Sequence, residues 1–138
     1  MRSMELLIDS NVFIDMFQKR QPFLGFATKV ISSCVCNLNV GFVSAHSLSD
    51  MFYILRKDFS FAERKECVRF ICTYFTVISE KKDDFLAVVD NSFCPDLEDG
   101  LQMQCAHKYN LDYIVTRNIK DFVSSSVPAI TPADFLNL

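Results

Sequence analysis

The chain has 138 residues, half of them hydrophobic, which suits one compact domain with a buried core. Its formal net charge of −3 at pH 7 excludes a strongly basic protein that coats nucleic acid. No apolar run reaches the roughly 20 residues that a membrane-spanning helix needs. We therefore expect residues 1–138 to form a single soluble, cytoplasmic domain with no membrane partner.

Short β segments alternate with longer helical segments along the chain. The first strand is predicted over residues 5–9, a continuous apolar run of the kind that is buried on both faces of a parallel sheet. The elements predicted next are helices over 12–17 and 23–36, a strand over 39–43, and amphipathic helices over 44–57 and 61–74.

The second half of the chain continues the alternation. It is predicted to hold a strand over 75–78, helices over 83–89 and 97–109, strands over 113–116 and 128–130, and a terminal helix capped by Thr131. Strands separated by helices imply right-handed crossovers and a parallel sheet that is covered on both faces. The sequence therefore predicts an α/β fold, a three-layer α/β/α sandwich around a mostly parallel sheet.

Six cysteines are present, but no two of them form a Cys-x-x-Cys pair. Cys34 and Cys36 lie two apart and the others are scattered among apolar neighbours, where free cysteine behaves as a small buried hydrophobe. This pattern favours reduced thiols over a zinc site or a disulfide framework. Reduced thiols agree with a cytoplasmic location.

Acidic residues follow the predicted strands, and in parallel α/β folds ligands bind at the carboxyl ends of the strands. Asp9 ends the first strand, and Asp121 closely follows the fourth. Asp50 lies one to two turns into the helix after the second strand, and Asp99 lies in the first turn of helix 97–109. Four acids placed independently would rarely all fall on one rim, so we predict that they converge.

Each acid also has a purely structural interpretation. Asp9 and Asp96 are natural N-caps, and a carboxylate at Asp99 suits the dipole of the following helix. Asp50 would then face solvent, and Asp121 would close a turn. These interpretations explain single residues but not the convergence.

Clustered carboxylates repel one another and raise each other's pKa unless a cation neutralises them. Their oxygens suit Mg²⁺ or Mn²⁺, and such an ion activates water and stabilises charge on a phosphoryl oxygen. We therefore hypothesise phosphodiester hydrolysis at this rim. His46 and His107 lie in predicted helices and are interpreted as packing or surface residues.

Four stretches, taken together, resemble a PIN domain. They are LIDSNVFID at 7–15, VSAHSLSD at 43–50, DLEDGLQ at 96–102 and IVTRNIKDF at 114–122. No single stretch is specific, but their order and spacing match the family across nearly the whole chain.

The resemblance implies a Mg²⁺- or Mn²⁺-dependent endoribonuclease, often the toxin of a VapC-like toxin–antitoxin pair, with RNA as substrate, an antitoxin partner and a homodimeric state. Carried over by position, the catalytic acids are Asp9, Asp50, Asp99 and Asp121. The metal ligands are Asp9, Asp99, Asp121 and Asn118. Roles in binding substrate or supporting the acids fall to Ser10, Asn11, Asp96, Glu98, Thr116 and Arg117, of which Arg117 would meet a substrate phosphate.

One position departs from the resemblance, and two other functions remain open. The family most often has Glu where this chain has Asp50, so a metal ion would bind there through water. A PIN-like module could instead bind RNA or protein without cutting. A haloacid-dehalogenase-like phosphatase is suggested by Asp9-Ser10-Asn11-Val12, but that class needs a second acid where Asn11 stands.

Overall fold

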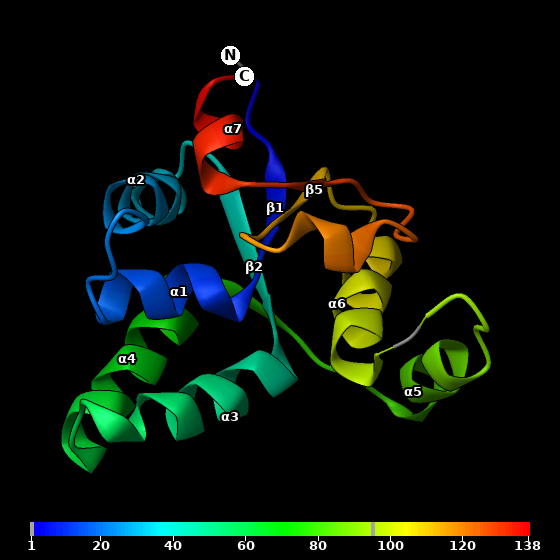
Figure 1. Ribbon diagram of the computed structural model, residues 1–138, viewed down its shortest axis with the longest axis horizontal. Coiled ribbons are helices and arrows are strands. Elements are labelled where there is room, and N and C mark those ends of the chain that lie inside the picture. Colours follow the sequence, from blue (N-terminus) through cyan, green and yellow to red (C-terminus); the bar gives the residue numbers. More distant parts are fainter. Residues whose placement is uncertain (1, 95) are drawn as a thin grey trace.

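A five-stranded sheet runs through the middle of the protein in the computed structural model, which describes residues 2–94 and 96–138 (Figure 1). The strands are β1 (Glu5–Ile8), β2 (Val40–Ser44), β3 (Thr76–Ile78), β4 (Tyr113–Val115) and β5 (Ala129–Ile130). Their order across the sheet is β3-β2-β1-β4-β5, and every neighbouring pair is parallel. The carboxyl ends of the three central strands therefore meet at one edge.

Helices cover both faces of this sheet (Figure 1). On one side lie α1 (Ser10–Phe17), α2 (Leu24–Val35), α3 (Ala45–Ile54), α4 (Phe61–Tyr74) and the short α7 (Pro132–Leu136). On the other side lie α5 (Lys82–Val89) and α6 (Leu97–Lys108). Two 3₁₀ turns complete the chain, η1 (Leu55–Lys57) and η2 (Ile119–Phe122). The predicted three-layer α/β/α sandwich is confirmed.

Two hydrophobic clusters hold the layers together, one on each face of the sheet. Successive strand residues point to opposite faces, so Leu6 and Ile8 join the cluster under α1 and α2, whereas Leu7 joins the cluster under α6. Both neighbours of β1 continue this division, because Val43 lies on the first face and Ile114 on the second. Burial on both faces explains why the strands read as unbroken apolar runs.

The predicted elements match the observed ones closely, and the differences fall at their ends. Asp9 was included in the first strand, but its backbone is the N-cap of α1 and its side chain accepts a hydrogen bond from the backbone N–H of Ser10. The predicted helix over 44–57 is divided, since α3 ends at Ile54 and a 3₁₀ turn follows. The 3₁₀ turn η2 after β4 has no counterpart among the predictions.

The cysteines of the described chain are all free thiols. Burial disfavours the thiolate and raises the pKa of Cys34 to about 11 and that of Cys105 to about 12. These two thiols are therefore unreactive core side chains, as their apolar surroundings in the sequence predict. Within residues 2–94 and 96–138, no helix combines the length and the apolar character that crossing a membrane requires.

Candidate active site

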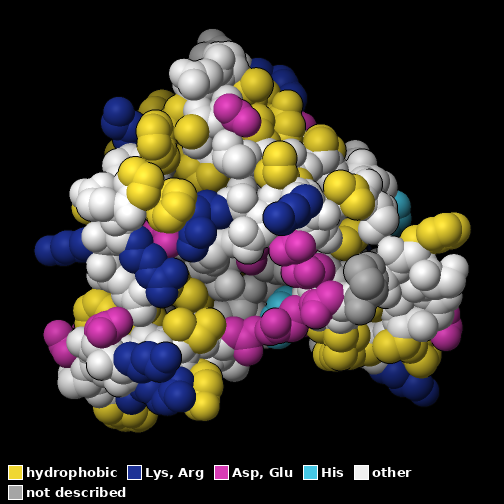
Figure 2. Space-filling view, in the orientation of Figure 1, with side chains coloured by type: hydrophobic (Ala, Val, Ile, Leu, Met, Phe, Trp, Pro, Cys, Tyr) yellow, Lys and Arg dark blue, Asp and Glu magenta, His cyan; other side chains and the backbone are white. Residues whose placement is uncertain are grey.

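A hollow of about 230 Å³ lies at the carboxyl edge of β1, β2 and β4, and we call it the acidic hollow. Figure 2 shows acidic side chains gathered around it between the two groups of helices, with lysine and arginine side chains mainly to its left. The residues that line it are Asp9, Ser10, Asn11, Ile14, His46, Ser47, Asp50, Ile54, Glu98, Asp99, Gln102 and Asn118. Of the residues singled out in the sequence, Asp96, Thr116, Arg117 and Asp121 lie outside this lining.

Asp9 is the best-anchored acid of the hollow. Its Oδ1 accepts from the backbone N–H of Ser10 at 2.8 Å and from Nε2 of Gln102 at 2.9 Å. Its Oδ2 accepts from Oγ1 of Thr116 at 2.8 Å and from Nδ2 of Asn11 at 3.3 Å. Because all four partners donate, the two carboxylate oxygens of Asp9 are held in one orientation. The longest of these bonds, from Asn11, is the one that an incoming cation would displace most easily.

Gln102 is a residue to which the sequence analysis gives no role. It is 3% exposed, and its amide also donates to Oγ of Ser47 at 3.2 Å. Oε1 of Gln102 is buried and accepts no hydrogen bond from any residue that the structure describes. One signal was available, because Gln102 follows Asp99 by three positions on a helix and must share its face.

Asp99 lies half-buried near Asp9, Asp96 and Asp121. Burial is the largest cause that raises the pKa of Asp99 to about 6, and the negative charges of Asp96, Asp121 and Asp9 add to it. Asp121, in η2, is exposed, but its charge acts on Asp99. These three acids, Asp9, Asp99 and Asp121, form one group.

Asp50 and Glu98 form a second group within the hollow. A hydrogen bond with Asp50 is the largest cause that raises the pKa of Glu98 to about 7, followed by burial and by the charges of Asp50, Asp96 and Asp99. The shorter acid of α3 thus meets the longer acid of α6. The contact raises the pKa of Glu98 because two neighbouring carboxyl groups repel each other when both are ionised.

Supporting residues connect β4 to Asp9. Thr116 is fully buried, and its Oγ1 accepts from the backbone N–H of Asn118 at 3.1 Å while it donates to Asp9. Oδ1 of Asn11 accepts from the backbone N–H of Arg117 at 3.3 Å. This network sets the position of the loop that carries Asn118 relative to the first acid.

The side chain of Arg117 is held by a buried acid. Its Nε and Nη2 donate to the two carboxylate oxygens of Asp15 at 2.6 and 3.2 Å, and its guanidinium carbon lies 4.3 Å from the centre of the Phe23 ring. Two nitrogens of the guanidinium are thus already hydrogen-bonded to Asp15. The role of Arg117 at a substrate phosphate stays a prediction.

Asp96 is the N-cap of α6, because its side chain accepts from the backbone N–H of Asp99. Ser10 takes part through its backbone N–H. Both residues therefore position the acids on either side of the acidic hollow, Asp99 and Asp9.

His46 lies in the lining of the acidic hollow, whereas the sequence favoured a packing or surface role. Its Nδ1 lies 2.8 Å from Oε2 of Glu80, and its backbone N–H donates to Oε1 of the same carboxylate at 3.0 Å. Glu80 follows β3 by two residues, so the strand-end rule that selects Asp9 also selects Glu80. Glu80 is not among the predicted site residues.

The donor set fits a divalent cation that prefers oxygen. Carboxylate oxygens from Asp9, Asp99 and Asp121 and the amide oxygen of Asn118 are hard ligands of the kind that Mg²⁺ and Mn²⁺ take. The raised pKa of Asp99 agrees with this, because burial and then the negative charges of Asp96, Asp121 and Asp9 disfavour its ionised form when no cation is bound.

The same raised pKa predicts a pH dependence of stability in the metal-free protein. An acid whose pKa is higher in the folded than in the unfolded chain favours folding while it is protonated. For Asp99, with a folded pKa of about 6 against an ordinary value of 3.8, this contribution is complete below pH 4 and is lost as the pH rises through 6. Because Asp99 is partly exposed, we expect a loss of roughly 1 kcal/mol.

Thermal unfolding in EDTA at pH 4.5 and pH 8 checks this expectation. The wild type should lose a few degrees more than Asp99→Asn between the two values, since about 1 kcal/mol shifts the melting temperature by about that much. Equal losses in both proteins would contradict the assignment of the raised pKa.

An all-parallel α/β/α sandwich with acids at the carboxyl edge of its central strands defines the class of this protein. The family model of the PIN domain matches residues 5–120, and the chain therefore belongs to the PIN domain family. A search of curated protein sequences gave no match.

Solved structures share this fold at low sequence identity. A toxin–antitoxin complex from Klebsiella pneumoniae has a TM-score of 0.66 at 20% identity, over 92% of this chain and 97% of that chain. VapBC2 from Rickettsia felis, bound to a promoter DNA fragment, has a TM-score of 0.68 at 15% identity, over 93% and 98%. VapC20 of Mycobacterium tuberculosis, a sarcin-ricin loop cleaving toxin, has a TM-score of 0.64 at 12% identity, over 79% and 86%. At these identities the likeness shows the fold alone.

Proposed function

We propose that this protein is a metal-dependent endoribonuclease that hydrolyses phosphodiester bonds of RNA in the cytoplasm. The observation that carries the proposal is the group of Asp9, Asp99 and Asp121 at the carboxyl edge of the sheet. Four donors hold Asp9, and burial together with the neighbouring acids raises the pKa of Asp99. A Mg²⁺ or Mn²⁺ ion held by these acids and Asn118 would lower the pKa of a water molecule and stabilise charge on the phosphate.

The chain's own residues would orient the substrate around this group. Asp9 is held rigidly, so it would fix the position of the reacting phosphate relative to the sheet edge. The hollow opens between two helical layers, and lysine and arginine side chains lie beside it in Figure 2, where they would attract a phosphate backbone. RNA as the substrate also agrees with the sarcin-ricin loop cleavage named for the structural neighbour VapC20.

Asp99→Asn is the sharpest test of this proposal. In the described part of the chain no hydrogen bond reaches the Asp99 carboxylate, so the variant removes charge without breaking a structural contact. Loss of a residue that only supports a metal ligand already costs about 10–100-fold. Loss of a ligand should therefore lower the rate of Mn²⁺-dependent cleavage of mixed RNA by more than about a hundredfold.

Asp83→Asn is the matched control, because Asp83 is likewise an acid in the first turn of a helix, α5, but is exposed and lies outside the acidic hollow. It should cut at the wild-type rate. Equal cleavage by the wild type and Asp99→Asn, or no cleavage by the wild type with any divalent metal, would overturn the proposal and favour a PIN-like module that binds without cutting. Hydrolysis of small phosphomonoesters would instead favour the phosphatase alternative, which membership of the PIN family does not support.

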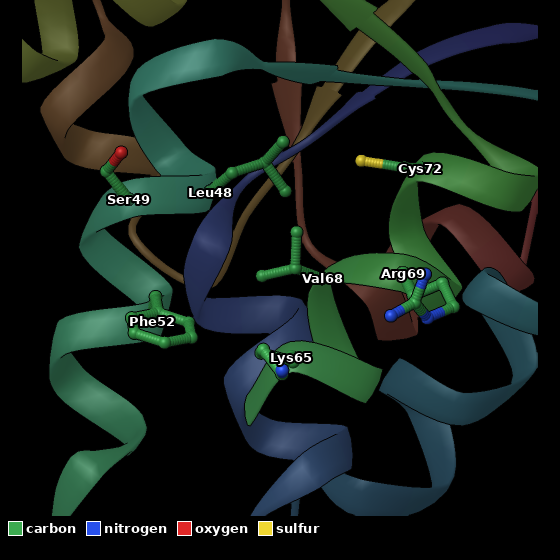
Figure 3. A pocket seen from close by; sticks show the side chains of 7 residues that line it. All are labelled: Leu48, Ser49, Phe52, Lys65, Val68, Arg69 and Cys72. Atoms are coloured by element: carbon green, nitrogen blue, oxygen red, sulfur yellow. The ribbon is translucent and has the colours of Figure 1, made fainter. Parts of the chain in front are cut away.

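We further propose that the protein is the toxin of a toxin–antitoxin pair and that it acts as a homodimer. A groove of about 590 Å³ separates α3 from α4 (Figure 3). Its lining is apolar with two cations, and consists of Leu48, Ser49, Phe52, Lys65, Val68, Arg69 and Cys72. An antitoxin helix with an apolar stripe and acidic flanks fits this lining, and several structural neighbours are toxin–antitoxin complexes.

A further inference from the structure

A histidine and two acids of the acidic hollow come together beside the group of Asp9, Asp99 and Asp121. One ring nitrogen of His46 and one carboxylate oxygen each of Asp50 and Glu98 all lie within 4.8 Å of one another. His46 and Asp50 are four residues apart on α3 and therefore share one helix face. Glu98 approaches them from α6. The cluster thus joins the two helical layers.

Glu80 holds His46 in a defined orientation. Both oxygens of this carboxylate are engaged by His46, one by the ring Nδ1 and one by the backbone N–H, and the Glu80 side chain is 4% exposed. A carboxylate only accepts, so Nδ1 carries the hydrogen and Nε2 is the ring nitrogen that can bind a metal ion. Histidines that bind metals almost always donate their other N–H to a carboxylate, a carbonyl or water in this way.

The polar lining beside the cluster contains an unmatched acceptor. Gln102 lines the same hollow and is 3% exposed, and its Oε1 accepts no hydrogen bond within the described residues. A buried acceptor without a donor lowers the stability of a protein. Its presence in the acidic hollow agrees with a site in which a bound ion and its water molecules supply the missing donor.

We propose that His46, Asp50 and Glu98 form a second divalent-metal site that takes a transition-metal ion such as Mn²⁺ in preference to Mg²⁺. An imidazole nitrogen suits transition metals, whereas Mg²⁺ is held by oxygen ligands. Two ligand atoms that each lie about 2.0–2.2 Å from one ion must be closer to each other than 4.8 Å, the limit within which the three ligand atoms lie here. The side chain of Glu98 is long and exposed, so it can move toward His46 and Asp50 when an ion binds.

The second site also accounts for Asp50, the acid that is shorter than the PIN family's usual Glu. Asp50 does not have to extend to the ion held by Asp9, because it would bind the second ion together with Glu98 and His46. The proposal deepens the proposed function and rests on it for its biological role. Its test uses no RNA, so the two proposals fail separately.

Mn²⁺ binding to the wild type, measured by pulsed electron paramagnetic resonance, tests the site directly. We expect two Mn²⁺ ions per chain, one of which shows coupling to a ¹⁴N nucleus from an imidazole. Excess Mg²⁺ should displace the Mn²⁺ ion that lacks ¹⁴N coupling and leave the Mn²⁺ ion that shows it. Absence of ¹⁴N coupling in the wild type, or loss of the coupled ion to Mg²⁺, would overturn the proposal without any variant.

Substitutions then assign the nitrogen. His46→Gln should bind one Mn²⁺ ion and lose the ¹⁴N coupling, whereas His107→Gln, at an exposed histidine bonded to Ser126, should keep both ions and the coupling. Glu80→Gln should weaken the coupled site by about 10–100-fold. Asp99→Asn should keep the coupled ion even if it no longer cuts RNA. Retention of the coupling in His46→Gln would contradict the assignment.

Discussion

Asp9→Asn should lower the rate of RNA cleavage by more than about a hundredfold and the free energy of unfolding by about 1–3 kcal/mol. Both effects follow from the four donors around this carboxylate. An asparagine has one oxygen and one NH₂ group, so in either orientation its NH₂ faces two donors. The variant therefore loses a charge that a metal ion needs and also leaves buried donors unpaired.

Thr116→Val removes a support of Asp9 without removing its charge. The variant loses the 2.8 Å donor to Oδ2 of Asp9 and the acceptor of the Asn118 backbone N–H, but it keeps the shape of the side chain. Cleavage of the same RNA should fall by about 10–100-fold, as for other residues that orient a metal ligand. Urea unfolding of both variants gives the stability changes. Wild-type cleavage by Asp9→Asn would show that this acid takes no part in the reaction.

Asp15→Ala should lower the free energy of unfolding by about 2–4 kcal/mol, which is large for a site outside the core clusters. Asp15 is 1% exposed, and it pairs with Arg117 through two hydrogen bonds. Removal of the acid leaves the guanidinium with only the Phe23 ring and partial access to water. The cost is below that of a fully buried pair because Arg117 is 25% exposed.

Urea unfolding with a double-mutant cycle checks this expectation. In Arg117→Met, the one cation left near Asp15 among the described residues is Arg20 at 4.0 Å. The double variant should give a coupling of about 1–3 kcal/mol between Asp15 and Arg117. Glu66→Ala is the control, because it breaks the exposed ion pair with Arg69 and should change stability by less than about 1 kcal/mol. An Asp15→Ala change as small as that of Glu66→Ala would contradict the expectation.

Local patterns in the sequence were sufficient for the fold. The apolar run at 5–9 and the helical periodicity at 61–74 depend on neighbours a few residues away, and both elements are present, with α4 over Phe61–Tyr74 as predicted. The strand-end rule likewise needs only the end of each strand, which is why Asp9 and Asp121 were singled out. The ends of elements were less certain because one capping contact moves them.

The missed residues act across long sequence distances. Gln102 reaches Asp9 over 93 positions and Glu80 reaches His46 over 34, and no spacing rule connects such pairs. Asp15 was quoted only as part of a motif, since its partner Arg117 lies 102 positions away. Polar networks inside a fold depend on which layers meet, and that information arises only from the packed structure.

The division of the acids also has a mechanical consequence. His46 and Asp50 belong to α3 on one side of the sheet, while Glu98 belongs to α6 on the other. A cation bound between them would be a reversible crosslink between two halves that otherwise touch mainly through the sheet. Metal supply would then control how far the acidic hollow can open, and with it the amide hydrogen exchange of the first turn of α6.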